Sequence, residues 1–228
     1  MSVLPPIEAK RGLRTLLRGA RSAMDPEDRR EQAEGLCGVV ADFVQRSTAA
    51  PGMGGPPGPG APLWTPDRRG RPLVMAYLGI PPEPDTVALL HELHGRGFGV
   101  VVPICEPEYQ LSWAGWQPGV ELKRSAHGPV DEPTGQRFTF DELAGVGLIL
   151  VPALAVDRTG QRIGQGGGYY DRFLARHPLN GPDAVPRFGY VYRQELLAAG
   201  SIPAEPLDQP LSGVFTADGA LSFDRAEG

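Results

Sequence analysis

The chain begins with two segments in which apolar residues recur every three or four positions, the spacing of a helix with one buried face. Residues 8–23 repeat apolar side chains such as Leu13 and Leu17 in this way. A second helix is predicted from Asp25-Pro26 to about Arg46, because an N-cap aspartate followed by proline is typical of a helix start.

From residue 73 onward, uniformly apolar runs alternate with helical spacing. Runs such as LVMAYL, VVVPI and GLILVP lack polar alternation, as expected of strands covered on both faces. The predicted strands are 73–78, 99–104, 110–114, 147–152 and 188–192, and the predicted helices are 86–96, 169–176 and 194–199. Asp218-Gly219 between two apolar runs predicts a C-terminal β-hairpin. We therefore expect an α/β fold of Rossmann-like type, with three layers: an open, largely parallel sheet and helices on both faces.

Residues 47–71 interrupt this pattern and show no periodicity. Ten of the twelve residues from Pro51 to Pro62 are glycine or proline, a composition that does not pack into a core. We predict a mobile insertion at 47–71 within a single domain of residues 1–228.

Charge and composition narrow the classes of function. The 22 Lys and Arg residues against 27 Asp and Glu give a formal net charge of −5, which provides no field to attract nucleic acid or anionic lipid. No apolar stretch is long enough for a signal-peptide core or a membrane span. The two cysteines, Cys37 and Cys105, form no CxxC motif and are expected to be reduced and buried. A cytoplasmic monomer that binds neither nucleic acid nor membranes is expected.

The most informative segment is 148–176, in which a buried strand leads through the glycine-rich stretch GQGGG at 164–168 into a helix. Glycines let the backbone approach a phosphate closely, and the N–H groups of a helix start favour an anion. The spacing excludes a dinucleotide fingerprint, whose third glycine would fall at Tyr169, and a P-loop, which needs a lysine. The alternative is a flexible glycine turn with Asp171 capping the helix, which the adjacent Arg162 and tyrosine pair disfavour.

The sequence RIGQGGGYYDR at 162–172, preceded by VPALAVD at 151–157, resembles the signature of the 5-formyltetrahydrofolate cyclo-ligases, also called 5,10-methenyltetrahydrofolate synthetases. Further pieces occur in the order of that family: Lys10-x-x-x-Arg14, AYL at 76–78 with Glu83 and Thr86, Val102-Pro103, Gly128 with Glu132-Pro133, and Pro203 with Asp208. The resemblance covers most of the chain and leaves out residues 47–71.

The resemblance implies a ligase of one-carbon folate metabolism that takes ATP as co-substrate and Mg²⁺ as cofactor. Similar enzymes transfer the γ-phosphoryl of ATP to the formyl oxygen of 5-formyltetrahydrofolate. N10 then attacks the activated carbon, and phosphate leaves to give 5,10-methenyltetrahydrofolate. Phosphorylation makes a poor leaving group a good one, so the protein mainly has to align the reactants and neutralise charge.

The same resemblance, carried over residue by residue, implies an ATP site on the first helix and the glycine-rich segment. The implied ATP-binding residues are Lys10, Arg14, Arg162, Ile163, Gly164, Gln165, Gly166, Gly167, Gly168, Tyr169 and Tyr170, of which Lys10, Arg14, Arg162 and Tyr169 are also implied to be catalytic. Lys10 and Arg14 share one face of the helix because they are four residues apart. Arg18 and Arg21 extend that face, and we expect them to be solvated.

For the folate, the resemblance implies binding by Leu78, Glu83 and Tyr169. Glu83 follows the first predicted strand, at the edge where open α/β sheets hold ligands. A carboxylate there can accept paired hydrogen bonds from the amino-pyrimidine edge of a pterin. Asp171 and Asp208 are implied metal ligands, in keeping with the preference of Mg²⁺ for one or two carboxylates beside waters and phosphate oxygens.

Two other functions remain open on the residues alone. One is an enzyme related to sugar-phosphate isomerases or CoA-transferases, since such sheets also place glycine turns against phosphates. The other is a non-catalytic nucleotide-binding module. Its support is that Leu207 and Ser212 stand where the family often has a histidine and an acid, and that Gln165 and Gly167 stand where some relatives have a basic residue. Only the ligase should hydrolyse ATP when the folate is supplied.

Overall fold

The computed structural model describes residues 6–49, 73–179, 184–205 and 208–223. Helix α1 spans Pro6–Ala23 and helix α2 spans Pro26–Ala49. The predicted N-cap is confirmed, because Asp25 Oδ1 accepts the N–H of Glu27 at 2.8 Å.

The end of α2 differs from the prediction, since the helix continues past Arg46 to Ala49. Residues 47–49 contain neither glycine nor proline. The first residue that opposes a continuing helix is Pro51, because proline disfavours helical geometry in the residue before it. The predicted insertion 47–71 therefore begins inside α2. The rest of it, including the Pro/Gly-rich stretch, lies outside the described residues.

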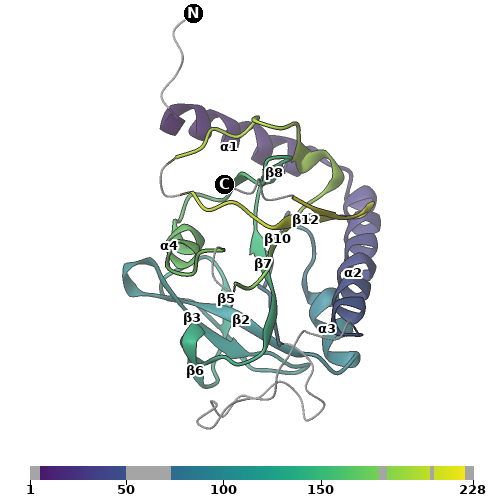
Figure 1. Cartoon of the computed structure of the whole chain (residues 1–228), viewed down its shortest axis with the longest axis vertical. Helices are drawn as coiled ribbons and strands as arrows, with labels where there is room; N and C mark the ends of the chain where they lie inside the picture. The colour runs from purple at the N-terminus through teal and green to yellow at the C-terminus, as the bar shows by residue number, and fades with distance from the viewer. Residues whose placement is uncertain (1–5, 50–72, 180–183, 206–207, 224–228) are drawn as a thin grey trace, which may run out of the picture.

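A central sheet lies between helices on both of its faces (Figure 1). In the described part of the chain it has eight strands in the order β13-β12-β10-β7-β1-β2-β3-β6. Their bounds are β1 Leu73–Met75, β2 Gly99–Glu106, β3 Gln110–Gly115, β6 Arg137–Phe138, β7 Val146–Pro152, β10 Arg187–Tyr190, β12 Gly213–Thr216 and β13 Gly219–Ser222. The run from β12 to β2 is parallel, whereas the pairs β12–β13, β2–β3 and β3–β6 are antiparallel. The expected α/β fold is confirmed.

Both faces of the sheet are covered, which explains the uniformly apolar strands. Val74 of β1 packs in a cluster with residues of α2 and of α3 (Val87–Gly95). Its neighbours Leu73 and Met75 belong to a second cluster, which includes residues of α4 (Tyr169–Arg176). Because successive side chains of a strand point to opposite faces, every position of a doubly covered strand has to be apolar.

The predicted helix 194–199 is wrong. The chain forms a 3₁₀ turn at Arg193–Glu195 and then strand β11, Leu196–Leu197. Six residues are too few for a stable isolated helix, and pairing with β8 (Ala155–Asp157) provides backbone hydrogen bonds instead.

Strand β11 belongs to a small sheet that supports α1. In the described residues this sheet has the order β11-β8-β9, with β9 at Arg162–Ile163. Leu13 and Leu17 of α1 pack on the cluster that this sheet contributes. The sequence pattern did not predict β8 and β9, which turn the chain back before the glycine-rich loop.

The remaining described elements are short. They are a hairpin of β4 (Leu122–Arg124) and β5 (Asp131–Pro133), and 3₁₀ turns at Pro107–Tyr109 and Phe140–Glu142. Among the described helices, none combines the length and the apolar character needed to cross a membrane.

Candidate active site

The glycine-rich loop, residues 164–168, packs against α1. Arg14 donates from Nε to the carbonyl oxygen of Gly164 at 3.1 Å. The side chain of Arg162 lies against the same glycine, because a Cβ added to Gly164 would be 2.8 Å from Arg162 Nη1. Two guanidinium groups from distant parts of the sequence therefore meet at one residue of the loop.

The shape of this loop depends on glycine at two positions. Gly166 has φ +96° and Gly168, the N-cap of α4, has φ +77°. Residues with a side chain rarely adopt this left-handed conformation. The loop consequently delivers the chain into the first turn of α4, where unpaired backbone N–H groups favour an anion.

Lys10 is almost completely buried, with 3% of its surface exposed. Its ammonium group forms ion pairs with Glu205 Oε2 at 2.8 Å and with Asp208 Oδ2. Asp208 Oδ2 also accepts the backbone N–H of Glu205 at 2.7 Å. A predicted ATP-binding residue and a predicted metal ligand thus contact each other.

A second predicted pair is formed by Arg162 and Asp171. Arg162 Nη2 forms an ion pair with Asp171 Oδ1, while Arg162 Nη1 donates to the carbonyl of Pro152 at 3.2 Å. The arginine side chain is 6% exposed and the aspartate 42%. The arginine is therefore fixed at the end of β7, and the carboxylate stays reachable from solvent.

The two predicted magnesium ligands are compatible with a site of low protein coordination. In the described residues no three His, Cys, Asp or Glu side chains come together as a metal cluster. Mg²⁺ requires only one or two carboxylates when phosphate and water supply the other oxygens. Asp171 uses Oδ1 and Asp208 uses Oδ2 in the ion pairs. Among the described residues the ion pairs thus occupy one oxygen of each carboxylate, and Asp171 is the more exposed of the two.

Glu83 lies in the loop between β1 and α3, beside the glycine-rich loop. Its Oε2 accepts the N–H of Ile80 at 3.0 Å, and its Oε1 accepts Nε2 of Gln165 at 3.0 Å. Leu78, at the start of the same loop, packs against the core cluster of α2 and α3. The structure therefore brings a predicted folate residue into contact with a predicted nucleotide residue.

The adjacent tyrosines face different surroundings. The hydroxyl of Tyr169 donates to the carbonyl of His127 at 2.8 Å, and desolvation raises its pKa. The ring of Tyr170 packs against Trp113, and desolvation of its hydroxyl raises the pKa of Tyr170 strongly. No hydrogen-bond partner of the Tyr170 hydroxyl exists among the described residues. Tyr169 therefore belongs to the rim of the site, and Tyr170 to the core beneath it.

The expectation that Arg18 and Arg21 are solvated is wrong for Arg21, whereas Arg18 is exposed. Arg21 is 2% exposed and forms a bidentate ion pair with Glu195 at 2.6 and 2.7 Å. Arg18 donates from Nε to Gln165 Oε1 at 3.0 Å and from Nη2 to the Gln165 carbonyl at 2.7 Å. The spacing of four residues between Arg14 and Arg18 already indicated that both reach one surface. Which protein groups contact that surface depends on the tertiary structure.

Tyr109 is a neighbour of the site that the sequence did not reveal. Its ring lies 5.5 Å from that of Tyr169, and the guanidinium of Arg172 lies 4.6 Å from its centre. Tyr109 and Glu108 have φ of 59° and 57°, conformations that a non-glycine residue adopts at a cost of about 1–3 kcal/mol. An aromatic residue in a turn has no periodicity that would have indicated this contact.

Other pieces of the family pattern meet around Cys105, which also neighbours Tyr169. Glu132 Oε1 accepts the N–H of Cys105 at 2.7 Å, and a Cβ added to Gly128 would lie 2.9 Å from Cys105 Sγ. Burial raises the pKa of the Cys105 thiol to about 11. Both cysteines are free thiols, as expected. They are half-buried, whereas the sequence pattern predicts that they are buried.

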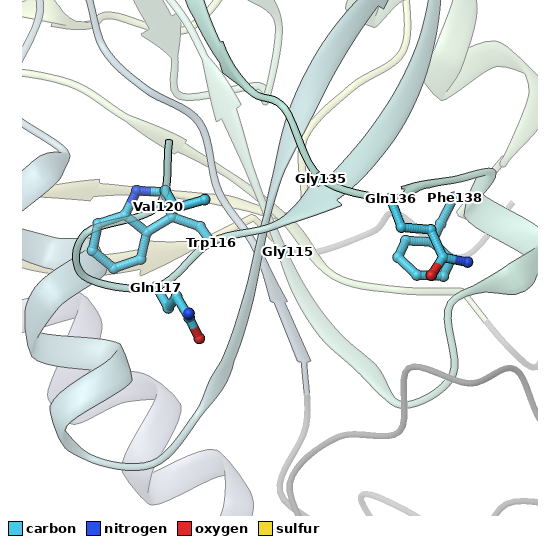
Figure 2. Close-up of a pocket in the computed structure, with 7 residues that line it drawn as sticks. All are labelled: Gly115, Trp116, Gln117, Val120, Gly135, Gln136 and Phe138. Carbon is cyan, nitrogen blue, oxygen red and sulfur yellow. The ribbon is translucent and has the colours of Figure 1, made fainter. Parts of the chain in front are cut away.

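A pocket lies at the end of the sheet opposite to the candidate site (Figure 2). It is lined by Gly115, Trp116, Gln117, Val120, Gly135, Gln136 and Phe138. Gly115 ends β3, which is antiparallel to β2, so the pocket lies toward the start of the parallel strands. It contains none of the predicted site residues, which gather where the parallel strands end.

Comparison with known proteins gives one family. The model of the 5-formyltetrahydrofolate cyclo-ligase family matches residues 66–217. The chain is 34% identical over 148 residues to 5-formyltetrahydrofolate cyclo-ligase of Mycolicibacterium smegmatis, covering 63% of this chain and 72% of that protein. It is 30% identical over 152 residues to the Escherichia coli K12 enzyme of the same name, covering 64% and 80%.

Solved structures agree at the level of the fold. The NMR structure of 5,10-methenyltetrahydrofolate synthetase from Aquifex aeolicus superimposes with a TM-score of 0.66 at 22% identity. The match covers 96% of this chain and 95% of that chain. A 5,10-methenyltetrahydrofolate synthetase from Mycoplasma pneumoniae gives a TM-score of 0.61 at 16% identity, with 91% and 98% coverage.

Proposed function

The chain belongs to the 5-formyltetrahydrofolate cyclo-ligase family and is a ligase, and we propose that it closes 5-formyltetrahydrofolate to 5,10-methenyltetrahydrofolate while ATP is converted to ADP and phosphate. One observation carries this proposal. The glycine-rich loop contacts a basic face of α1 on one side and Glu83 on the other. In this proposal the phosphate site and the carboxylate that binds the pterin therefore adjoin, as a transfer between ATP and folate requires.

In this proposal the phosphates of ATP are bound by Lys10, Arg14, Arg162 and the backbone N–H groups of the loop. All three cations are held by acceptors of the protein in the free state. A triphosphate would replace the neutral carbonyls that Arg14 and Arg162 contact, because charge-assisted hydrogen bonds to phosphate are stronger than those to neutral carbonyls. The cations then neutralise the charge that accumulates on the transferred phosphoryl group.

The folate would lie between Glu83 and Tyr169, with Leu78 as an apolar neighbour. Glu83 accepts hydrogen bonds from the pterin edge, and Tyr169 borders the end that carries the formyl group. The γ-phosphoryl group goes to the formyl oxygen, the bond from N10 to the formyl carbon forms as N10 loses its proton, and the phosphorylated oxygen leaves as phosphate, which can take up that proton. The residues of this chain orient these groups and provide no covalent nucleophile in this route.

Asp171 and Asp208 would hold Mg²⁺, which when bound withdraws charge from the phosphate oxygens. Arg162 orients Asp171 through their ion pair, and Lys10 does the same for Asp208. We further propose that residues 1–228 act as one catalytic domain, since α2, α3 and α4 pack on the same sheet.

The test is absorbance near the band of the methenyl product after mixing protein, ATP, Mg²⁺ and 5-formyltetrahydrofolate. We expect a rise that requires every component, with one ADP formed per product. Binding of ATP without loss of the folate would instead support the non-catalytic module. A lack of ATP hydrolysis in the presence of the folate, together with turnover of a sugar phosphate or a CoA ester, would favour the isomerase or transferase alternative.

A further inference from the structure

One side chain of the glycine-rich loop connects three segments that are far apart in the sequence. Gln165 donates from Nε2 to Glu83 Oε1 at 3.0 Å, and its Oε1 accepts Nε of Arg18 at 3.0 Å. Its carbonyl oxygen accepts Nη2 of the same arginine at 2.7 Å. The amide thus uses its donor on the loop after β1 and its acceptor on α1.

Packing does not account for a glutamine at this position. Gln165 is exposed, and the residues on either side of it are glycines. A side chain that carries a donor at one end and an acceptor at the other is needed to join a carboxylate to a guanidinium, and a primary amide meets this need. The contacts of Gln165 with Glu83 and Arg18 are therefore its distinguishing property.

These contacts place Gln165 in competition with both substrates of the proposed reaction. In the free protein, both oxygens of Glu83 are engaged, one by Gln165 and the other by the N–H of Ile80. A paired contact with a pterin needs both oxygens. A triphosphate on the loop is a stronger acceptor for Arg18 than a neutral amide oxygen. Binding of the triphosphate therefore breaks the hydrogen bond by which Arg18 holds the side chain of Gln165.

Resting on the proposed function, we propose that Gln165 is a positioning residue that couples the nucleotide site to the folate site. Without nucleotide it holds Glu83. When a triphosphate engages the loop and Arg18, Gln165 releases Glu83 for the folate. The two substrates consequently promote each other's binding, because such a coupling is reciprocal.

The test measures the dissociation constant of 5-formyltetrahydrofolate by calorimetry, with and without a non-hydrolysable ATP analogue and Mg²⁺. In the unmodified protein the analogue should tighten folate binding about fivefold or more. Gln165→Ala should tighten folate binding without nucleotide by a similar factor. The ratio of the folate dissociation constant without the analogue to that with the analogue should then fall to about one. Gln165→Glu keeps an acceptor for Arg18 but has no donor for Glu83, so its ratio should fall as well.

Gln136→Ala is the matched control, because Gln136 is an exposed amide at the pocket on the opposite edge of the sheet. It should retain the ratio of the unmodified protein, and thermal unfolding should show that all variants fold. An unchanged ratio in Gln165→Ala, or weaker folate binding without nucleotide, would overturn the inference while methenyl formation still supports the proposed function. If the unmodified protein forms no methenyl product, the proposed function and this inference both fail.

Discussion

Each lysine or arginine at the candidate site already has an acceptor in the free protein. Lys10 is paired with Asp208 and Glu205, and Arg162 with Asp171. A buried cation without a partner would be costly, so these carboxylates make a phosphate-binding site possible before phosphate arrives. Two of these carboxylates, Asp171 and Asp208, are the proposed magnesium ligands, which links the binding of the metal to the exchange of partners by the cations.

Asp171→Asn should lower kcat at least about a hundredfold with the fold retained, because the amide is a poor ligand for Mg²⁺ and cannot neutralise Arg162. Methenyl formation at several Mg²⁺ concentrations measures this loss. Asp131→Asn is the control, since Asp131 forms an exposed ion pair with Arg124 on the β4–β5 hairpin. Full activity of the Asp171 variant would remove this residue from the metal site.

The raised pKa of Cys105 leads to a prediction about reactivity. A thiol with a pKa of about 11 remains protonated at neutral pH, and only the thiolate reacts with alkylating reagents. In the Cys37→Ser variant, iodoacetamide should modify Cys105 at least tenfold more slowly than free cysteine at pH 8. The rate should still rise with pH above 10. A plateau below pH 9 would show that burial does not raise the pKa.

At the scale of elements, a buried ion pair between Arg21 and Glu195 fixes α1 to the rest of the protein. Arg21 binds both oxygens of Glu195 and also the carbonyl of Ala153 at 2.9 Å. Desolvation raises the pKa of Glu195 despite its pairing with Arg21. This anchor lies near the end of the helix whose earlier turns carry Lys10 and Arg14, so it fixes where those two cations lie.

Arg21→Ala should lower the free energy of unfolding by about 3–5 kcal/mol, because it leaves the carboxylate of Glu195 buried without its partner. Urea denaturation with a fitted slope measures the change. Arg30→Ala removes two exposed ion pairs on α2, with Glu27 and with Glu34, and it should have little effect. Equal effects of the two substitutions would show that burial of the Arg21 pair contributes nothing.

At the scale of the whole molecule, the site lies where the parallel strands end. The loop after β1 and the glycine-rich loop after β9 meet there, while α1 and Asp208 reach the same edge from distant parts of the chain. Such convergence is typical of open α/β sheets, in which crossover helices return the chain so that successive parallel strands finish on one side. The pocket in Figure 2 lies on the other side and takes no part in this arrangement.

Deletion of residues 51–62 should leave kcat and KM within about threefold, because a stretch of glycine and proline forms no packed surface. The described residues resume at β1, whose start pairs with β2 and β7 at the edge away from the candidate site. Replacement of the stretch by a glycine-serine linker of equal length separates the effect of its length from that of its sequence. A collapse of kcat in both variants would show that the insertion serves catalysis.

Periodicity and turn residues are local properties, so they suffice to predict the fold class, most strands and helices, and the glycine-rich loop. The helix 169–176 and the C-terminal hairpin occur close to where they were predicted. The helix 194–199 failed because strand pairing with β8 outweighs the local preference of a short segment. Only the tertiary structure decided that Arg21 is buried, that Arg18 and Glu83 meet at Gln165, and that Tyr109 borders Tyr169. These contacts join residues from separate elements, and their geometry depends on how the elements pack.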